Sequence, residues 1–293
     1  MRDLSFVNPD DRALKRWTMS AIEDILGRRK YVPLYRQWQR EIAPHSETML
    51  SDLLAFINVP LEIDAADGWP VSVPPDLPLV MVANHPFGLS DGIVACALAE
   101  QLGRPYKVII NNDLLKIPEI KPHALPIDFA ETREAMAMNI KTRADARKAL
   151  ENGTTIVIFP AGGVATAANP FGMAEDLPWK TFVARLVQLS KASVLPLYFN
   201  GQNSPAFHLA SRISLTLRLS LLISEFRRFP GRPCAVKVGR LTAFEDLKHA
   251  HDRKKLTDEV YRLVHRLAPR AVGRSEHELN PRPAEVRPKY PGL

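Results

Sequence analysis

The sequence predicts a mixed α/β fold in which a largely parallel sheet is flanked by helices. Short apolar runs, typical of buried strands, alternate along the chain with longer helical stretches. Clusters of Pro, Gly, Asn and Asp separate these segments. The 293 residues, 46% of them hydrophobic, suffice for a substantial core. The predicted strands lie at residues 59–63, 79–83, 106–110, 125–128, 154–159, 194–199 and 234–239.

The chain divides into three predicted parts. Residues 1–63 form a helical N-terminal extension, whose stretch 12–30 carries apolar residues at near-helical spacing among arginines and lysines. Such a helix can lie on an anionic membrane or pack on the main domain, and Pro33 is expected to break it. Residues 64–272 form the α/β domain with a C-terminal helix. Residues 273–293 are Pro-rich and charged, which predicts a disordered tail.

One strand-to-helix turn carries residues suited to catalysis. The apolar run 79–83 leads into Asn84-His85-Pro86-Phe87-Gly88, and Asp91 follows where a helix begins. A neutral imidazole can take a proton from a hydroxyl, and a carboxylate on its other nitrogen fixes the tautomer. We therefore predict that His85 and Asp91 are catalytic and that the nucleophile is the hydroxyl of a second substrate, which gives direct acyl transfer.

This turn resembles the signature of the glycerolipid acyltransferases, the lysophosphatidate acyltransferase superfamily. Members usually have four residues between the His and the Asp, whereas here the five residues 86–90 intervene. The Asn-His-Pro-Phe-Gly form is similar to a bacterial branch often labelled hemolysin-like, related to the O-acyltransferases that complete ornithine lipids. The resemblance covers roughly residues 50–245. It implies that Asn84, Pro86, Phe87 and Gly88 contact substrate beside the catalytic pair.

Three further segments resemble the other motifs of this superfamily. The segment after the strand 106–110 usually carries a Phe and an Arg; neither is in place, although Lys116 could supply a cation or be a solvated helix end. Phe159-Pro160-Ala161-Gly162-Gly163 matches a Phe-Pro-Glu-Gly turn, except that Ala161 replaces the Glu and no Arg follows. Leu195-Pro196-Leu197 resembles the last motif, and its proline suggests a sheet edge, a bulge or a ligand-facing kink. The predicted substrate-binding residues here are Asn112, Lys116, Phe159, Pro160, Gly162, Gly163 and Pro196.

Two rival interpretations stay open. The segment 88–92 reads Gly-Leu-Ser-Asp-Gly, which is the nucleophile-elbow pattern of α/β-hydrolases, with Ser90 as the nucleophile. That motif should follow its strand at once, but Asn84-His85-Pro86-Phe87 comes between. The non-enzymatic alternative is a lipid-binding protein on the same fold. A second active-site histidine at His208 is conceivable, but a core or surface role is expected.

Residues 211–228 permit two structures. Apolar and polar residues alternate from 213 to 221, which is the pattern of a strand. Folded as a helix, the same segment gathers Ser211, Ser214, Arg218 and Glu225 into one narrow polar stripe. We predict a helix, as the related sequences favour. It could enter a membrane interface, line an acyl-chain tunnel or pack in the core.

Charge and composition indicate the partners. The 39 Lys and Arg residues exceed the 32 Asp and Glu residues, which favours an anionic membrane, an acidic carrier protein or a phosphorylated substrate. No motif indicates nucleic-acid binding, a metal site or another cofactor. No apolar run is long enough to span a bilayer, and no signal segment is evident. Cys96 and Cys234 are expected to be reduced and buried.

The resulting functional prediction is an O-acyltransferase with a lysolipid acceptor, either lyso-ornithine lipid or a lysophospholipid. The donor is expected to be a thioester, acyl-ACP or acyl-CoA, because a proton-accepting His activates only the hydroxyl. Its expected place is cytoplasmic, peripheral on the inner face of the cell membrane.

Overall fold

The computed structural model describes residues 28–213 and 215–269. Within these ranges the chain forms a seven-stranded sheet with helices on both faces, as the sequence predicts. Most of the predicted N-terminal basic helix and the whole of the predicted tail at 273–293 lie outside the described residues. The predicted boundary at residue 63 stays a prediction, and a strand of the sheet runs across it.

The sheet has the strand order β1-β7-β6-β2-β5-β3-β4. The five strands from β6 to β4 run parallel to one another, β7 is antiparallel to β6, and β1 is parallel to β7. The strands are β1 Leu61–Ala65, β2 Leu79–Ala83, β3 Tyr106–Asn111, β4 Ala124–Ile127, β5 Thr155–Ile158, β6 Ser193–Phe199 and β7 Cys234–Val238.

Helices cover the two faces of the sheet and bury the central strands completely. Met81 of β2 packs in one core with α3 and α4, whereas Val80 and Val82 pack in the other with α5, α6 and α9. Burial on both faces explains why these strands read as continuous apolar runs. The helices are α2 Arg28–Glu41, α3 Met49–Phe56, α4 Leu89–Gln101, α5 Arg133–Glu151, α6 Phe182–Ser190, α7 Pro205–Ile213, α8 Leu215–Phe226 and α9 Arg253–His265, with 3₁₀ turns at Ala43–His45, Asn112–Lys116, Pro118–His123 and Phe244–Asp246.

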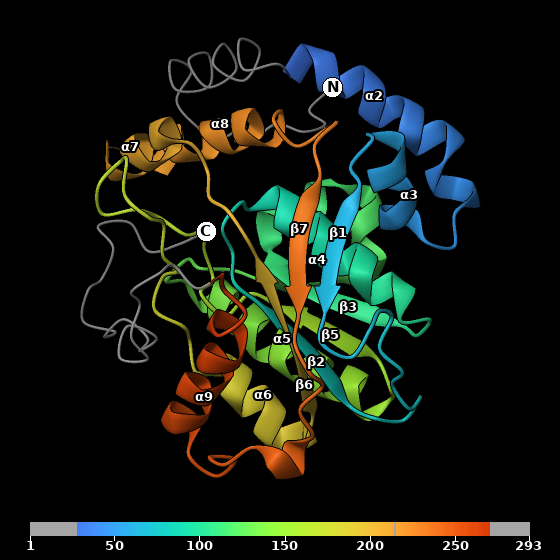
Figure 1. The fold of residues 1–293 in the computed structure, drawn as a ribbon, viewed down its shortest axis with the longest axis vertical. Coiled ribbons are helices and arrows are strands. Elements are labelled where there is room, and N and C mark those ends of the chain that lie inside the picture. Colours follow the sequence, from blue (N-terminus) through green and yellow to red (C-terminus); the bar gives the residue numbers. More distant parts are fainter. Residues whose placement is uncertain (1–27, 214, 270–293) are drawn as a thin grey trace.

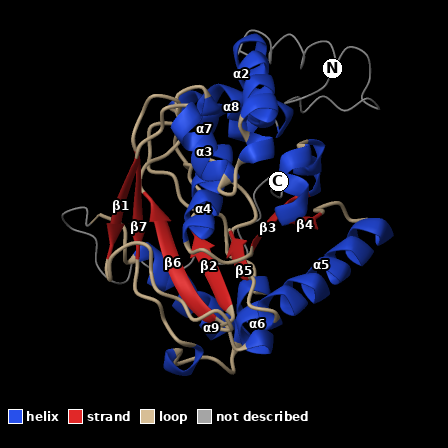
Figure 2. Ribbon diagram, turned by 90° about the vertical axis from the view of Figure 1, so that its right-hand side faces the viewer, coloured by secondary structure: helices blue, strands red, loops and turns tan. Residues whose placement is uncertain are grey.

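Residues 211–213 and 215–226 are helical, so the prediction of helix over strand is confirmed and the alternating pattern is misleading. They belong to two helices, α7 and α8, which lie beyond the ends of the strands together with α2 (Figure 1). The arrowheads of β2 and β6 point toward this end (Figure 2). Arg218 of α8 is buried and so is the side chain of Glu225. The polar stripe therefore faces the protein.

Pro33 does not break the N-terminal helical region, contrary to the prediction. It lies inside α2, which continues to Glu41. Contacts with the rest of the domain stabilise the turns after the proline: Trp38 is buried, and the side chains of Tyr35 and Gln39 donate hydrogen bonds to Glu119. Tertiary packing of this kind routinely overrides local propensity.

Pro196 lies in an interior strand, so the predicted edge position is wrong and the predicted bulge is correct. Strand β6 pairs with β2 on one side and β7 on the other. Between the pairs Leu197–Val238 and Val194–Thr242, two residues of β6 face three residues of the other chain segment, which defines a bulge. Gly239 belongs to this bulge, and a Cβ there would lie 2.7 Å from Pro196 Cγ.

The opposite end of the sheet, where the parallel strands begin, is held by Arg104. Its guanidinium donates to the carbonyl oxygens of Pro74 and Leu77, which precede β2, and to that of Gly153, which precedes β5. Gly153 has a φ of +73°, and a Cβ there would lie 2.6 Å from Pro75 O. This turn therefore needs glycine both for its backbone conformation and for its close approach to a neighbouring backbone.

Gly153→Ala is expected to destabilise the fold by about 2–4 kcal/mol, because it adds backbone strain and a clash with a main-chain oxygen. Gly103→Ala is the matched control, since Gly103 also has a positive φ but nothing lies within 4 Å of its Cβ position. It should cost only about 1 kcal/mol. Urea unfolding of both variants checks this, and equal losses of stability would contradict it.

Candidate active site

Asn84 fastens the end of β2 to the end of β6. Its side-chain Nδ2 donates to Phe199 O (3.0 Å) and its Oδ1 accepts from Phe199 N (2.7 Å). The amide nitrogen and oxygen of the buried Asn84 side chain thus both bond to the backbone of Phe199, and they extend the pairing of the two strands. The structure gives Asn84 this structural role, and its predicted contact with substrate stays a prediction.

His85 and Asp91 lie side by side at the end of β2. The His85 Nδ1 is 3.2 Å from Asp91 Oδ1, within ion-pair distance, although the N–H direction is poorly aligned for a hydrogen bond. The Asp91 side chain is fully buried, while that of His85 is 17% exposed. Because Nδ1 faces the carboxylate, Nε2 is the nitrogen available to a ligand. The structure therefore brings the predicted catalytic pair together.

The Asp91 carboxylate is fixed by the turn it belongs to. Its Oδ2 accepts from Phe87 N (2.9 Å) and its Oδ1 accepts from Gly92 N (2.8 Å). Asp91 lies in the first turn of α4, where the helix dipole favours a negative charge. These interactions offset the cost of burying the carboxylate and determine which way it faces.

The backbone of His85 is held from both sides by distant segments. Its N–H donates to Asp176 Oδ1 (3.0 Å), and its carbonyl accepts from Ala165 N (2.7 Å). The other carboxylate oxygen of Asp176 accepts from Trp179 Nε1 (2.9 Å) and lies 3.8 Å from His265 Nε2. Asp176 is buried and was not predicted. Only the acidic pair Glu175-Asp176 in the connection before α6 marks it in the sequence, which is a weak signal.

The turn after β5 forms a second side of the site. The Phe159 ring lies against the His85 ring, with the two centroids 4.3 Å apart. Gly162 has a φ of +66°, and the Lys180 Nζ lies 2.9 Å from where its Cβ would be. Lys180 also lies over the Phe129 ring, and burial lowers the pKa of its ammonium group. Phe159, Pro160, Gly162 and Gly163 therefore lie in one turn beside His85, as the sequence predicts.

Gly88 lets the turn after β2 approach closely both the turn after β5 and α8. Its φ is +87°, and its Cβ would lie 3.0 Å from Val164 Cγ2 and 3.1 Å from Leu222 Cδ2. The Phe87 ring occupies the space above Gly201, whose Cβ would lie 2.6 Å from it. Pro86 is buried in the same turn.

Asn112, Lys116 and Pro196 belong to other segments than the His85 turn. Asn112 and Lys116 lie in the 3₁₀ turn after β3, where the Lys116 Nζ is 3.5 Å from Asp113 Oδ1 and half-exposed. Pro196 is buried inside β6. In the described ranges no hydrogen bond or ion pair links any of the three to the His85 turn, so their substrate-binding roles stay predictions.

The geometry does not favour the hydrolase interpretation. Ser90 is buried in the first turn of α4, and within the described part of the chain no histidine is hydrogen-bonded to its hydroxyl. His208 is also buried; its Nδ1 accepts from Ala167 N (3.3 Å), and burial lowers its pKa. His208 thus has a core position. Cys96 and Cys234 are free and buried, as predicted.

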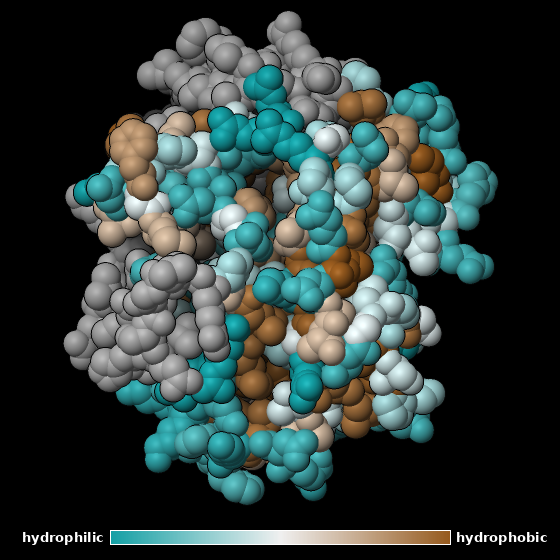
Figure 3. Space-filling view, viewed as in Figure 1, coloured by the Kyte–Doolittle hydropathy of each residue, from teal (hydrophilic) through white to brown (hydrophobic). Residues whose placement is uncertain are grey.

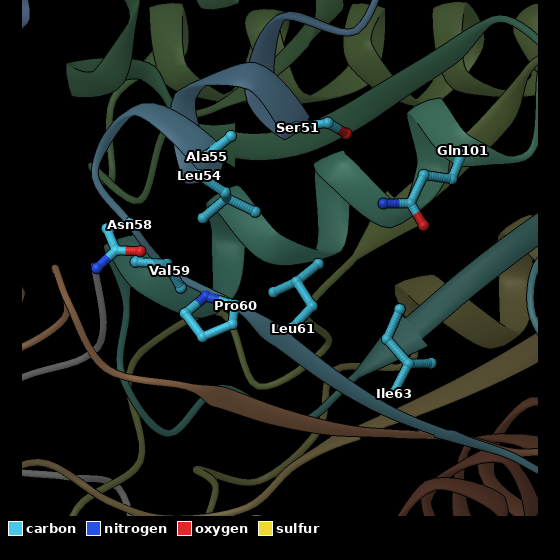
Figure 4. A pocket seen from close by; sticks show the side chains of 9 residues that line it. All are labelled: Ser51, Leu54, Ala55, Asn58, Val59, Pro60, Leu61, Ile63 and Gln101. Atoms are coloured by element: carbon cyan, nitrogen blue, oxygen red, sulfur yellow. The ribbon is translucent and has the colours of Figure 1, made fainter.

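A separate pocket of about 370 Å³ lies between α3 and the edge strand β1 (Figure 4). Leu54 and Ala55 of the helix and Leu61 and Ile63 of the strand line it, with Gln101 at its border. None of the predicted site residues contributes to it, so this pocket is distinct from the His85 turn.

Comparison with known proteins gives one family. The family model described as Acyltransferase matches residues 70–200, which include the His85 turn and the turn after β5. The chain is 28% identical over 184 residues to a lyso-glycine lipid O-acyltransferase of Bacteroides thetaiotaomicron, which covers 60% of this chain and 61% of that protein. It is 27% identical over 180 residues to one of Phocaeicola vulgatus, covering 60% and 59%. The chain thus spans about three fifths of the length of these relatives.

A crystal structure of the 1-acyl-sn-glycerophosphate acyltransferase PlsC from Thermotoga maritima covers 87% of this chain and 93% of its own, with 15% identity and a TM-score of 0.45. The predicted hemolysin-like branch stays a prediction. The matched residues 70–200 hold the Asn-His turn, the paired Asp91 and the Phe159-Pro160 turn in one site, and these matches agree with the predicted resemblance to the glycerolipid acyltransferase superfamily.

Proposed function

We propose that this chain is an O-acyltransferase that moves a fatty acyl chain from a thioester to the hydroxyl of a lysolipid. The observation that supports this most directly is the approach of His85 Nδ1 to the buried Asp91 carboxylate at 3.2 Å. That arrangement leaves Nε2 to accept the proton of the acceptor's hydroxyl.

The reaction then needs no enzyme nucleophile. The hydroxyl oxygen attacks the thioester carbonyl as its proton passes to His85 Nε2, and Asp91 stabilises the imidazolium. The new C–O bond forms, the C–S bond breaks, and the thiolate leaves with the proton that His85 returns. The Phe159 ring beside His85 limits the access of water to the imidazole.

For the acceptor, the names of the relatives support a lysolipid that carries an amino acid. Lyso-ornithine lipid belongs to the same chemical class as the lyso-glycine lipid named for both relatives. Ala161 and the missing Arg of its turn also favour this class over a phosphomonoester. Lysophospholipid is the second candidate because Lys180 places a cation beside Gly162. The net charge of +7 suits both acyl-ACP and acyl-CoA as donors.

An apolar surface near the site supports contact with an anionic membrane. Phe171 and Met173, in the loop before α6, are 86% and 61% exposed, and Leu209 and Ile213 of α7 are also exposed. Hydrogen bonds of Gln202 and Arg212 join this loop to the start and side of α7. Figure 3 shows apolar surface at the outer end of α7. No helix among the described residues has both the length and the hydropathy to cross a bilayer.

His85→Ala is expected to lower acyl transfer by about 10²–10⁴-fold, because general-base catalysis contributes a factor of that size. Thermal unfolding should change little, since the His85 ring makes no buried hydrogen bond that the fold needs. His251→Ala, at an exposed position, is the control that should keep full activity. The assay follows acylated lipid by mass spectrometry with acyl-ACP and acyl-CoA as donors.

Full activity of the His85→Ala variant would contradict the proposed mechanism. Lipid binding without turnover by the wild type would favour the lipid-binding alternative. Covalent labelling by a fluorophosphonate that is lost in Ser90→Ala would favour the hydrolase.

Met173→Asp is expected to weaken binding to anionic vesicles by about tenfold or more, because it removes an apolar contact and adds repulsion. Met136→Asp on α5 is the matched control, since Met136 is 57% exposed but lies outside the loop and α7. Sedimentation with phosphatidylglycerol vesicles checks this. Equal binding of both variants and the wild type would remove the loop from the membrane contact.

A further inference from the structure

Arg218 is a buried cation on the inner side of α8. Its side chain places the guanidinium carbon 5.7 Å from the Phe207 ring centroid, and its Nη2 donates to Val164 O (2.8 Å). The residue is 4% exposed. A guanidinium has five N–H donors, and within the described residues this is its one hydrogen bond.

No carboxylate of the described chain forms an ion pair with Arg218. Glu225, seven residues later on the same helix, instead accepts from the backbone and hydroxyl of Ser204 and lies 3.6 Å from Arg228 Nη1. Burial lowers the pKa of the Arg218 guanidinium to about 10. Within the described ranges, Arg218 is therefore a desolvated charge without a paired counter-charge.

Such an arrangement is costly, because buried charges are normally paired or hold a ligand. One hydrogen bond to a carbonyl does not require arginine, since a neutral amide could donate it. The unused donors of Arg218 therefore indicate an anion that the described part of the chain does not supply, and a planar guanidinium suits a carboxylate or phosphate.

The position of Arg218 connects it to the catalytic turn. Val164, whose carbonyl it binds, is followed by Ala165, whose N–H donates to His85 O (2.7 Å). Leu222 is four residues after Arg218 on α8, so it lies on the same side of the helix. Leu222 contacts the space above Gly88, three residues after His85. Arg218 thus faces the two turns that hold the catalytic histidine.

We propose that Arg218 binds the anionic head group of the acceptor lysolipid. This rests on the proposed function, because the acceptor must present its hydroxyl to His85. In a lysolipid the head-group anion is close to the hydroxyl that reacts, whereas the phosphates of a thioester donor are separated from the thioester by the long pantetheine arm. The shared chemistry is an anionic oxygen group, which is a carboxylate in an acyl-amino acid and a phosphate in lysophosphatidate.

Equilibrium binding without any donor tests this proposal. The probes are a hydroxyacyl-glycine, in which glycine is joined through its nitrogen to a hydroxylated fatty acid, its uncharged methyl ester, and lysophosphatidate, all in neutral detergent micelles. The wild type should bind the free acid about tenfold or more tightly than the ester. Arg218→Gln should bind acid and ester alike, with the acid weakened by about ten- to a hundredfold. The affinity lost in Arg218→Gln is compared between the hydroxyacyl-glycine and lysophosphatidate. The larger loss shows whether the site prefers a carboxylate or a phosphate.

Arg147→Gln is the matched control, an exposed arginine of α5 paired with Glu151, and it should bind as the wild type does. Arg218→Gln should melt close to the wild type, because no ion pair is lost and the Gln amide can still donate to Val164 O. If that variant does not fold, Arg218→Lys replaces it. Lysine keeps the positive charge but lacks the planar pair of N–H donors of a guanidinium. The Arg218→Lys variant should therefore still prefer the acid over the ester, but by a smaller factor than the wild type.

An unchanged preference for acid over ester in Arg218→Gln, or no preference in the wild type, would overturn the proposal. The same proteins are then given an acyl thioester. If the wild type transfers the acyl chain and Arg218→Gln has no effect, the proposed acyltransferase activity is supported and the role of Arg218 is contradicted. If lipid binding depends on Arg218 but no transfer occurs, the anion site is supported and the acyltransferase activity is contradicted.

Discussion

The buried Asp91 carboxylate is the interaction on which the candidate site depends. It accepts two backbone N–H groups, from Phe87 and Gly92, and it lies 3.2 Å from the His85 imidazole. A single side chain therefore closes the turn between β2 and α4, begins the helix and faces the histidine. Since the charge is buried, loss of either backbone N–H donor would leave part of the carboxylate unsatisfied. The five-residue spacing between His85 and Asp91 is compatible with this geometry because Gly88 supplies a positive φ.

The His85 backbone is fixed by residues from other parts of the chain. Asp176 binds its N–H, and Ala165 binds its carbonyl. Both come from the long connection between β5 and α6, which also contains the Phe159 turn. This connection therefore shapes the site more than its lack of regular secondary structure suggests. Preorganisation of this kind lets a catalytic group act without reorganising during the reaction.

Much of the fold could be predicted because the central strands are buried on both faces. Leu79–Ala83 is apolar throughout and Thr155–Ile158 is apolar after its first residue, and the turn after each carries its Pro and Gly residues. The His85–Asp91 pair was predictable for a related reason, since short-range spacing around one turn determines their approach. The failures were Pro33 and the edge position of Pro196, where tertiary contacts and a glycine bulge across the sheet decide the outcome.

Asp176 and Arg218 were beyond sequence reasoning because their partners are distant in the chain. Asp176 is 91 residues from His85, and Arg218 is 54 residues from Val164. For Arg218 one signal existed: the polar stripe of a helix that is otherwise mainly apolar. In a helix on a soluble domain such a stripe would face water, but here Arg218 and the side chain of Glu225 are buried.

This arrangement fits the proposed lysolipid acyltransferase. On α7 the apolar residues Leu209 and Ile213 are exposed, while Phe207 and His208 of the same helix are buried. An apolar outer side next to a polar inner side would let a lysolipid keep its chain in an apolar environment while its head group approaches a cation. Under the proposal for Arg218, the free energy spent on burying the guanidinium would favour anion binding. An arginine that is already desolvated needs little further desolvation when an anion binds.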